Sequence, residues 1–129
     1  FGSFLADRPA APQLWVAGGI GITPFLAQLR AGMVRQQTQL LYLYRAEADA
    51  AFLQELQTLA ARDPKLSLQA IATGQTIPDL KALLPTADDL AQHECYLCGP
   101  PGMVAGLRKA LKARGITPRH IHYENFEFR

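Results

Sequence analysis

Short apolar runs alternate with amphipathic stretches along almost the whole chain, a pattern typical of strands that alternate with helices. Five runs are predicted to be strands: 13–19, 39–45, 65–73, 94–100 and 119–128. Three stretches with helical spacing of apolar residues are predicted to be helices: 23–34, 50–63 and 101–115. The stretch 76–92 contains two prolines and is predicted to be irregular, with short helical turns.

The predicted helix faces and ends follow from particular residues. The inward faces of the first two helices are expected to carry Phe25, Leu26, Leu29, Met33, Phe52, Leu53, Leu56 and Leu59. Thr23 is expected to cap the first helix, with Pro24 in its first turn. Met103 is expected to open the last helix, and Gly115 to end it.

Strands that alternate with helices predict a parallel sheet covered by helices on both faces. We therefore expect an α/β fold: a three-layer αβα sandwich around a five-stranded parallel sheet, with strand order 3-2-1-4-5. The 129 residues are enough for one domain with one core. Residues 1–12 are expected to form a linker, and residues 13–129 the domain.

Composition and charge narrow the class of protein. A net charge of +2 is too small to indicate a nucleic-acid or membrane-surface partner. No apolar run approaches the ~18 residues that a membrane span requires. Cys95 and Cys98 lie three apart on a predicted strand and so point to opposite faces. We expect two free thiols in a reducing compartment rather than a disulfide or a metal site.

The stretch "AGGIGITPF" follows the first predicted strand directly and opens the first helix. Its glycines, Gly18, Gly19 and Gly21, permit positive φ and the close approach of a ligand or of other backbone. A helix N-terminus at the carboxyl end of a parallel strand suits a diphosphate. A tight turn without a ligand is the alternative, since proline stands where a G-x-G-x-x-G motif has its third glycine.

A second turn of the same kind, "YLCGPPGM", follows the fourth predicted strand. In the expected strand order the first and fourth strands are neighbours, so both turns flank one crevice. Together, "GGIGITPF" and "YLCGPPGM" resemble the nicotinamide-binding domain of the ferredoxin–NADP reductase family. The final "YENFEF" resembles the terminal strand of its ferric reductase and NADPH oxidase branch, and "FGSF" the end of an upstream flavin-binding barrel.

The resemblance implies that hydride passes from NAD(P)H to FAD, and that electrons continue to ferric iron, haem or an iron–sulfur centre. It implies roles for individual residues of this chain. Those that hold the pyrophosphate and border the nicotinamide would be Gly19, Gly21, Ile22, Thr23 and Pro24. The nicotinamide pocket would be formed by Cys98, Gly99, Pro100 and Met103. Glu124 would lie near the reacting centre, and Phe126 would cover the flavin face.

The chain also departs from the family. Ile20 stands where many members have threonine, and no Arg-x-Tyr-Ser/Thr flavin motif is present, so FAD is expected to bind to another part of a longer protein. The Ser-Arg pair that reads the 2′-phosphate of NADPH is absent after the third strand. Arg45, after the second strand, either reaches that phosphate or pairs with Glu47, and the pattern favours NADH.

A ferric reductase with membrane helices upstream of a cytoplasmic domain is the first hypothesis for the parent protein. The reductase component of an oxygenase and a non-catalytic nucleotide-binding module are the alternatives. His120 and His122 share a face of the last predicted strand, but without a third ligand we expect no metal. The basic stretch "LRKALKARG" suits the dipole of a helix end, and docking of an acidic electron carrier is its other interpretation.

Overall fold

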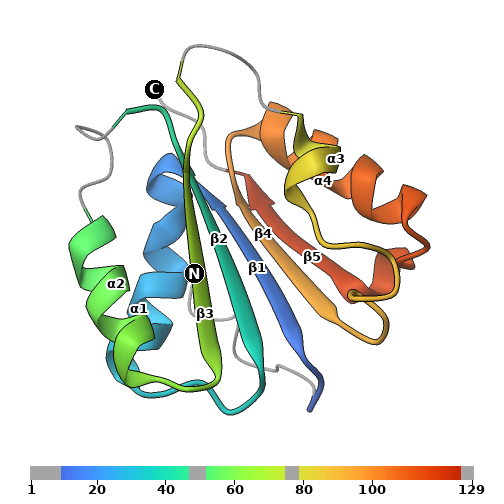
Figure 1. The fold of residues 1–129 in the computed structure, drawn as a ribbon. Coiled ribbons are helices and arrows are strands. Elements are labelled where there is room, and N and C mark those ends of the chain that lie inside the picture. The colour runs from blue at the N-terminus through green and yellow to red at the C-terminus, as the bar shows by residue number, and fades with distance from the viewer. Residues whose placement is uncertain (1–9, 47–51, 75–78, 126–129) are drawn as a thin grey trace.

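The computed structural model describes residues 10–46, 52–74 and 79–125 (Figure 1). Its elements, in chain order, are β1 (Gln13–Gly18), a 3₁₀ turn η1 (Gly19–Ile22), α1 (Thr23–Ala31), β2 (Thr38–Tyr44), α2 (Leu53–Arg62), β3 (Leu66–Ala72), α3 (Leu80–Leu83), β4 (Glu94–Gly99), α4 (Pro101–Ala113), a 3₁₀ turn η3 (Pro118–His120) and β5 (Ile121–Asn125).

The strands form one five-stranded sheet with the order β3-β2-β1-β4-β5. Every neighbouring pair is parallel. Helices α1 and α2 cover one face of the sheet, and α3 and α4 cover the other (Figure 1). The predicted fold class and strand order are therefore confirmed.

The two faces of the sheet carry separate hydrophobic cores, because successive strand residues point to opposite sides. Strand β1 lies in the centre and is buried at every position. Its Trp15 packs in the core under α1 and α2, where its ring stacks on Phe25 at a centroid distance of 5.1 Å. Leu14 and Val16 pack in the opposite core with α4. The cysteines follow the same rule, since Cys95 and Cys98 are free thiols in opposite cores, as predicted.

Three predictions about helix ends were wrong. Helix α1 ends at Ala31, so Met33 lies beyond it and is 64% exposed instead of facing the core. Thr23 does not cap α1, because the turn η1 precedes the helix and the Thr23 N–H donates to the carbonyl of Ile20. Helix α4 begins at Pro101, the start of its predicted range, so Met103 lies in its first turn and does not open it.

Other helix predictions are confirmed. Gly115 follows α4 with a φ of +87°, the left-handed conformation that glycine adopts readily at a helix end. The face of α2 that packs on the sheet is the predicted one, with Leu56 fully buried. In the described residues no helix is both long and apolar enough to cross a membrane.

Candidate functional site

The two glycine-rich turns meet at the carboxyl ends of the adjacent strands β1 and β4. Gly21 lies directly on the end of β4: a Cβ atom added there would lie 2.1 Å from the carbonyl oxygen of Cys98. The same atom would lie 2.9 Å from the Cα of Gly99. Only glycine fits this backbone-to-backbone contact, so Gly21 joins one turn to the other.

The Met103 side chain, which comes from α4, packs against the ends of both strands. A Cβ atom added at Gly18 would lie 2.4 Å from the Met103 sulfur, and one added at Gly99 would lie 2.6 Å from its methyl carbon. The two glycines, each the last residue of its strand, thus leave a slot that the Met103 side chain fills. We call the Gly21 contact and this filled slot the interlock.

Other residues of the first turn remain open to solvent. Gly19 has a φ of +55°, and a Cβ atom added there would meet nothing within 4 Å. Ile20 and Thr23 are exposed, whereas Ile22 and Pro24 are buried. Two positions at the start of α1 offer a ligand no backbone donor, because the Thr23 N–H is already bonded and Pro24 has none.

Cys98 and Glu124 stand directly opposite one another on β4 and β5. Cys98 is fully buried, and Glu124 is half-buried. Burial, and then the charge of Glu124, raises the pKa of the Cys98 thiol to about 12. The thiol is therefore neutral at physiological pH and presents a polarizable sulfur rather than a nucleophile or a base.

Comparison with known proteins explains this arrangement. Residues 15–109 match the family described as the oxidoreductase NAD-binding domain. The chain belongs to this family. It is an NAD-binding domain of the ferredoxin–NADP reductase type, and the two turns lie where the strand order of such a sheet changes direction.

The relatives of this NAD-binding domain are electron-transfer proteins. It is 34% identical to a ferredoxin–NAD(P)⁺ reductase component of naphthalene dioxygenase and salicylate hydroxylase systems from Ralstonia, over 96% of this chain and 41% of that protein. It is 32% identical to a Pseudomonas putida flavohemoprotein, over 97% of this chain and 34% of that protein. The chain thus spans less than half the length of either relative.

A solved structure of a related domain has the same fold. The flavohaem-like FAD/NAD-binding domain of nitric oxide dioxygenase from Vibrio cholerae matches 98% of this chain and 55% of its own, with 26% identity and a TM-score of 0.80. These relatives include an oxygenase reductase component and a flavohemoprotein, so the ferric reductase branch has no specific support.

One predicted residue, Arg45, lies away from the interlock. Arg45 follows β2 at the same edge of the sheet and is exposed, and its carbonyl accepts a bond from the Gly74 N–H at 2.9 Å. It lies on the far side of β1 from Cys98. Phe126 lies outside the described residues.

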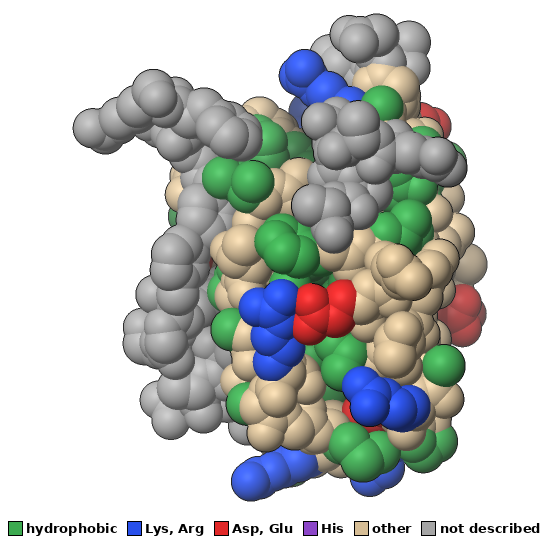
Figure 2. Space-filling model, turned by 90° about the vertical axis from the view of Figure 1, so that its left-hand side faces the viewer, with side chains coloured by type: hydrophobic (Ala, Val, Ile, Leu, Met, Phe, Trp, Pro, Cys, Tyr) green, Lys and Arg blue, Asp and Glu red, His purple; other side chains and the backbone are tan. Residues whose placement is uncertain are grey.

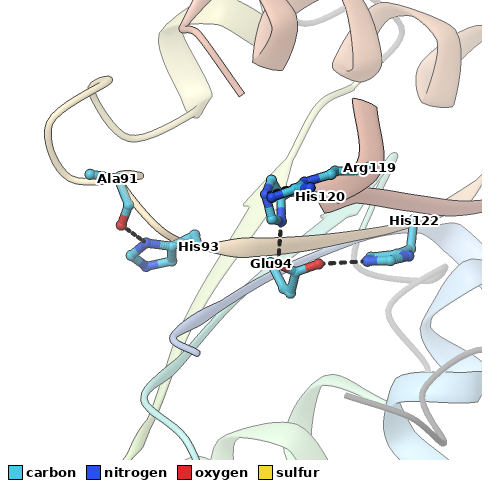
Figure 3. A network of polar contacts seen from close by, with 6 residues as sticks. All are labelled: Ala91, His93, Glu94, Arg119, His120 and His122. Carbon is cyan, nitrogen blue, oxygen red and sulfur yellow. Dashed lines mark hydrogen bonds and ion pairs between the residues drawn. The ribbon is translucent and has the colours of Figure 1, made fainter. Parts of the chain in front are cut away.

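The opposite end of the sheet holds a polar cluster that the sequence did not reveal. His120 and His122 both contact Glu94, which the sequence analysis did not single out (Figure 3). His120 ends η3 instead of lying on β5 as predicted. In the part of the chain that the structure describes, no group of three potential ligands is suited to a metal. The signal that could have identified Glu94 is a lone carboxylate at the start of an apolar strand.

Charges on the surface over α1 and α2 are dispersed. On that side of the molecule basic side chains lie apart from one another, and one adjoins an acidic group (Figure 2). An ion pair joins the two helices, with Arg30 Nε 2.6 Å from Glu55 Oε2. The described residues of this face therefore form no continuous basic patch.

Proposed function

We propose that this domain binds NAD(P)H across the interlock and presents the nicotinamide to a flavin held by another domain. The observation that carries the proposal is the contact of two glycine-rich turns at adjacent strand ends, with Cys98 and Glu124 paired beside it. This arrangement gives one coenzyme two contact regions, an open turn for its phosphates and a buried thiol for its ring.

The described residues divide between the two ends of the coenzyme. The open backbone at Gly19, the exposed Thr23 side chain and the positive end of α1 receive the pyrophosphate. Gly21, Ile22 and Pro24 set the path of that turn. The nicotinamide lies against Cys98, Gly99 and Pro100. Met103 packs against Gly99 from the side of α4. Gly18 leaves space for the Met103 sulfur.

Hydride transfer requires orientation more than proton chemistry. The neutral Cys98 thiol packs against the ring without taking a proton from it, and Glu124 supplies a negative charge on the same side. FAD, when bound, supplies the acceptor for the hydride and releases the electrons singly. Phe126 is proposed to cover the flavin until the nicotinamide replaces it.

The wider protein follows from the same proposal. Residues 1–12 would continue from a flavin-binding barrel, and residues 13–129 would form the coenzyme domain. The acceptor would be an oxygenase component, a haem or an iron–sulfur centre, as the names of the relatives indicate. A ferric iron acceptor is the competing proposal, and turnover of the longer gene product with ferric citrate against a ferredoxin distinguishes the two.

The binding site can be tested on this chain by amide NMR. Titration with NAD⁺ is expected to shift the amides of Gly18–Thr23 and Cys98–Met103, and NADP⁺ to act more weakly. Shifts confined to the opposite end of the sheet would contradict the proposed site. An absence of shifts at millimolar NAD⁺ and NADP⁺ would favour a non-catalytic module.

A further inference from the structure

Glu94 is a buried carboxylate at the start of β4, far along the strand from the interlock. Its side chain is only 6% exposed, although it carries a charge. It accepts a hydrogen bond from His120 Nδ1 at 2.6 Å and another from His122 Nε2 at 2.8 Å (Figure 3). Each carboxylate oxygen thus has its own donor, as a buried charge requires. We call these three residues the Glu94 clamp.

Each imidazole of the clamp is also held from a second side. The Arg119 Nε–H donates to His120 Nε2 at 3.2 Å, so His120 carries its proton on Nδ1 and points it at Glu94 (Figure 3). The His122 ring stacks on Tyr96, with centroids 4.6 Å apart and planes 18° apart. The start of β5 is therefore fixed to β4 in both position and orientation.

The clamp and the site belong to one row of side chains. Alternate residues of a strand share a face, and Tyr96 and Cys98 both lie in the core on the α1 side. The strand register places Tyr96 opposite His122 and Cys98 opposite Glu124. The row therefore runs from the Glu94 clamp, through the stacked pair, to the thiol and carboxylate at the proposed nicotinamide position.

Strand β5 depends on such a row because it lies at the edge of the sheet. In the described part of the chain it runs from Ile121 to Asn125 and pairs only with β4. Its other face is held by Ile121 in the core and by Tyr123, whose ring lies 4.1 Å from the Arg108 guanidinium carbon. On the face that carries Glu124, the clamp and the stacked pair are side-chain contacts that join the two strands.

We propose that Glu94 is a positioning residue: through His120 and His122 it fixes β5 against β4 and so sets where Glu124 stands beside Cys98. The coenzyme part of this inference rests on the function proposed above. The structural part, that the clamp controls the far end of β5, can be tested without any coenzyme.

The first test compares amide hydrogen exchange in the unmodified chain, Glu94→Gln and Glu55→Gln. Glu55 is the matched control, since it is also a carboxylate in a side-chain ion pair but lies on α2. Exchange at the β5 amides that donate to β4 is expected to quicken about tenfold in Glu94→Gln and to stay within about twofold in Glu55→Gln. Equal exchange in all three proteins would overturn the proposal.

The second test measures binding of NAD⁺ by the same three proteins. Glu94→Gln is expected to raise the Kd at least about fivefold, with altered amide shifts at Cys98, and Glu55→Gln to leave both unchanged. Unaltered affinity in Glu94→Gln would overturn the coenzyme part of the inference. If the unmodified chain does not bind NAD⁺, the proposed function fails, and the coenzyme part fails with it. Hydrogen exchange then still decides whether the clamp controls β5.

The variant His122→Ala covers the case in which Glu94→Gln fails to fold. It removes one of the two hydrogen bonds to Glu94 and the ring that stacks on Tyr96. Exchange at the β5 amides that bond to β4 is expected to quicken in this variant as well. Unchanged exchange would contradict the coupling.

Discussion

The two ends of the sheet are held together by different kinds of contact. At the carboxyl ends of the strands, backbone lies on backbone and a methionine fills a slot between two glycines. At the amino ends, a carboxylate, two imidazoles and a guanidinium hold β4 and β5 together (Figure 3). The difference teaches that the contact at the end proposed to bind an anionic coenzyme is made by backbone and an apolar side chain, whereas the distant end uses charge for anchoring.

The largest expected effect concerns the neutrality of the Cys98 thiol at the coenzyme end. Because the pKa of the Cys98 thiol is raised to about 12, its thiolate fraction at pH 8 should be about a thousandfold below that of an ordinary cysteine. Iodoacetamide is expected to leave Cys98 unlabelled in the folded chain, as mass spectrometry would show. The urea-unfolded chain should be labelled readily and serves as the control. Rapid labelling of Cys98 in the folded chain would show that its thiol is neither neutral nor shielded, contrary to this prediction.

The next effect tests whether the interlock is a contact between backbones. Gly21→Ala places a methyl group within 2.1 Å of a carbonyl oxygen, so the turns must separate. We expect a loss of about 3 kcal/mol in unfolding free energy, measured by urea titration. Gly102→Ala is the control, since a Cβ atom there meets nothing within 4 Å. Similar losses in the two variants would show that the interlock is not a special constraint.

The contribution of charge at the opposite end can be measured through its pH dependence. Burial opposes ionisation of Glu94, but hydrogen bonds from His122 and His120 together lower its pKa below its ordinary value. A carboxylate with a lowered folded-state pKa stabilises the fold above its unfolded pKa of about 4.3, and this contribution is lost as the pH falls through the folded value. Glu94→Gln should therefore be about 1–3 kcal/mol less stable than the unmodified chain at pH 7.

The same difference should shrink as the pH falls below the unfolded pKa and through the lowered folded-state pKa of Glu94. Urea unfolding at a series of pH values measures it in both proteins. A stability gap that stays constant from pH 7 to pH 3 would show that the clamp acts through shape and not through charge.

A smaller effect is expected at Arg45, the cation that follows β2 at the carboxyl edge. If Arg45 reads the 2′-phosphate, Arg45→Ala should weaken binding of NADP⁺ by about tenfold and leave NAD⁺ within about twofold. Calorimetric titration with both nucleotides measures the two affinities. Equal losses for NAD⁺ and NADP⁺ would place Arg45 at the pyrophosphate instead.

The smallest effect is expected where charge lies on the open surface. Arg30 and Glu55 form a close ion pair, and hydrogen bonding to Arg30 lowers the pKa of Glu55, but solvent screens such pairs. Glu55→Gln should change the melting temperature by no more than about 2 °C, measured by circular dichroism. A much larger drop would mean that exposed charges anchor this fold as firmly as the buried ones.

The fold could be predicted from the sequence because its signals are local. Apolar runs that end in glycine, such as the one before Gly18, identify both the strands and the edge at which they end. Helix ends were less predictable. Met33 has the right spacing for an inward position, but α1 stops two residues earlier, and spacing alone does not show where hydrogen bonding ends.

The site was partly predictable for a related reason. Both turns are continuous in sequence, so they could be recognised before it was known that they touch. The contact of Gly21 with the Cys98 carbonyl depends on how two distant segments approach each other, and no local pattern encodes that distance. Glu94 was missed for the same reason, because its partners follow it by 26 and 28 positions.

The position of Trp15 gives the chain an internal optical probe. It is the only tryptophan in the sequence, and it lies fully buried on β1, three residues before Gly18, the last residue of that strand. Indole emission overlaps the absorption of reduced nicotinamide, so a coenzyme bound beyond the end of β1 would quench it by energy transfer. Light from one residue could therefore report both occupancy of the domain and its unfolding, without any attached dye.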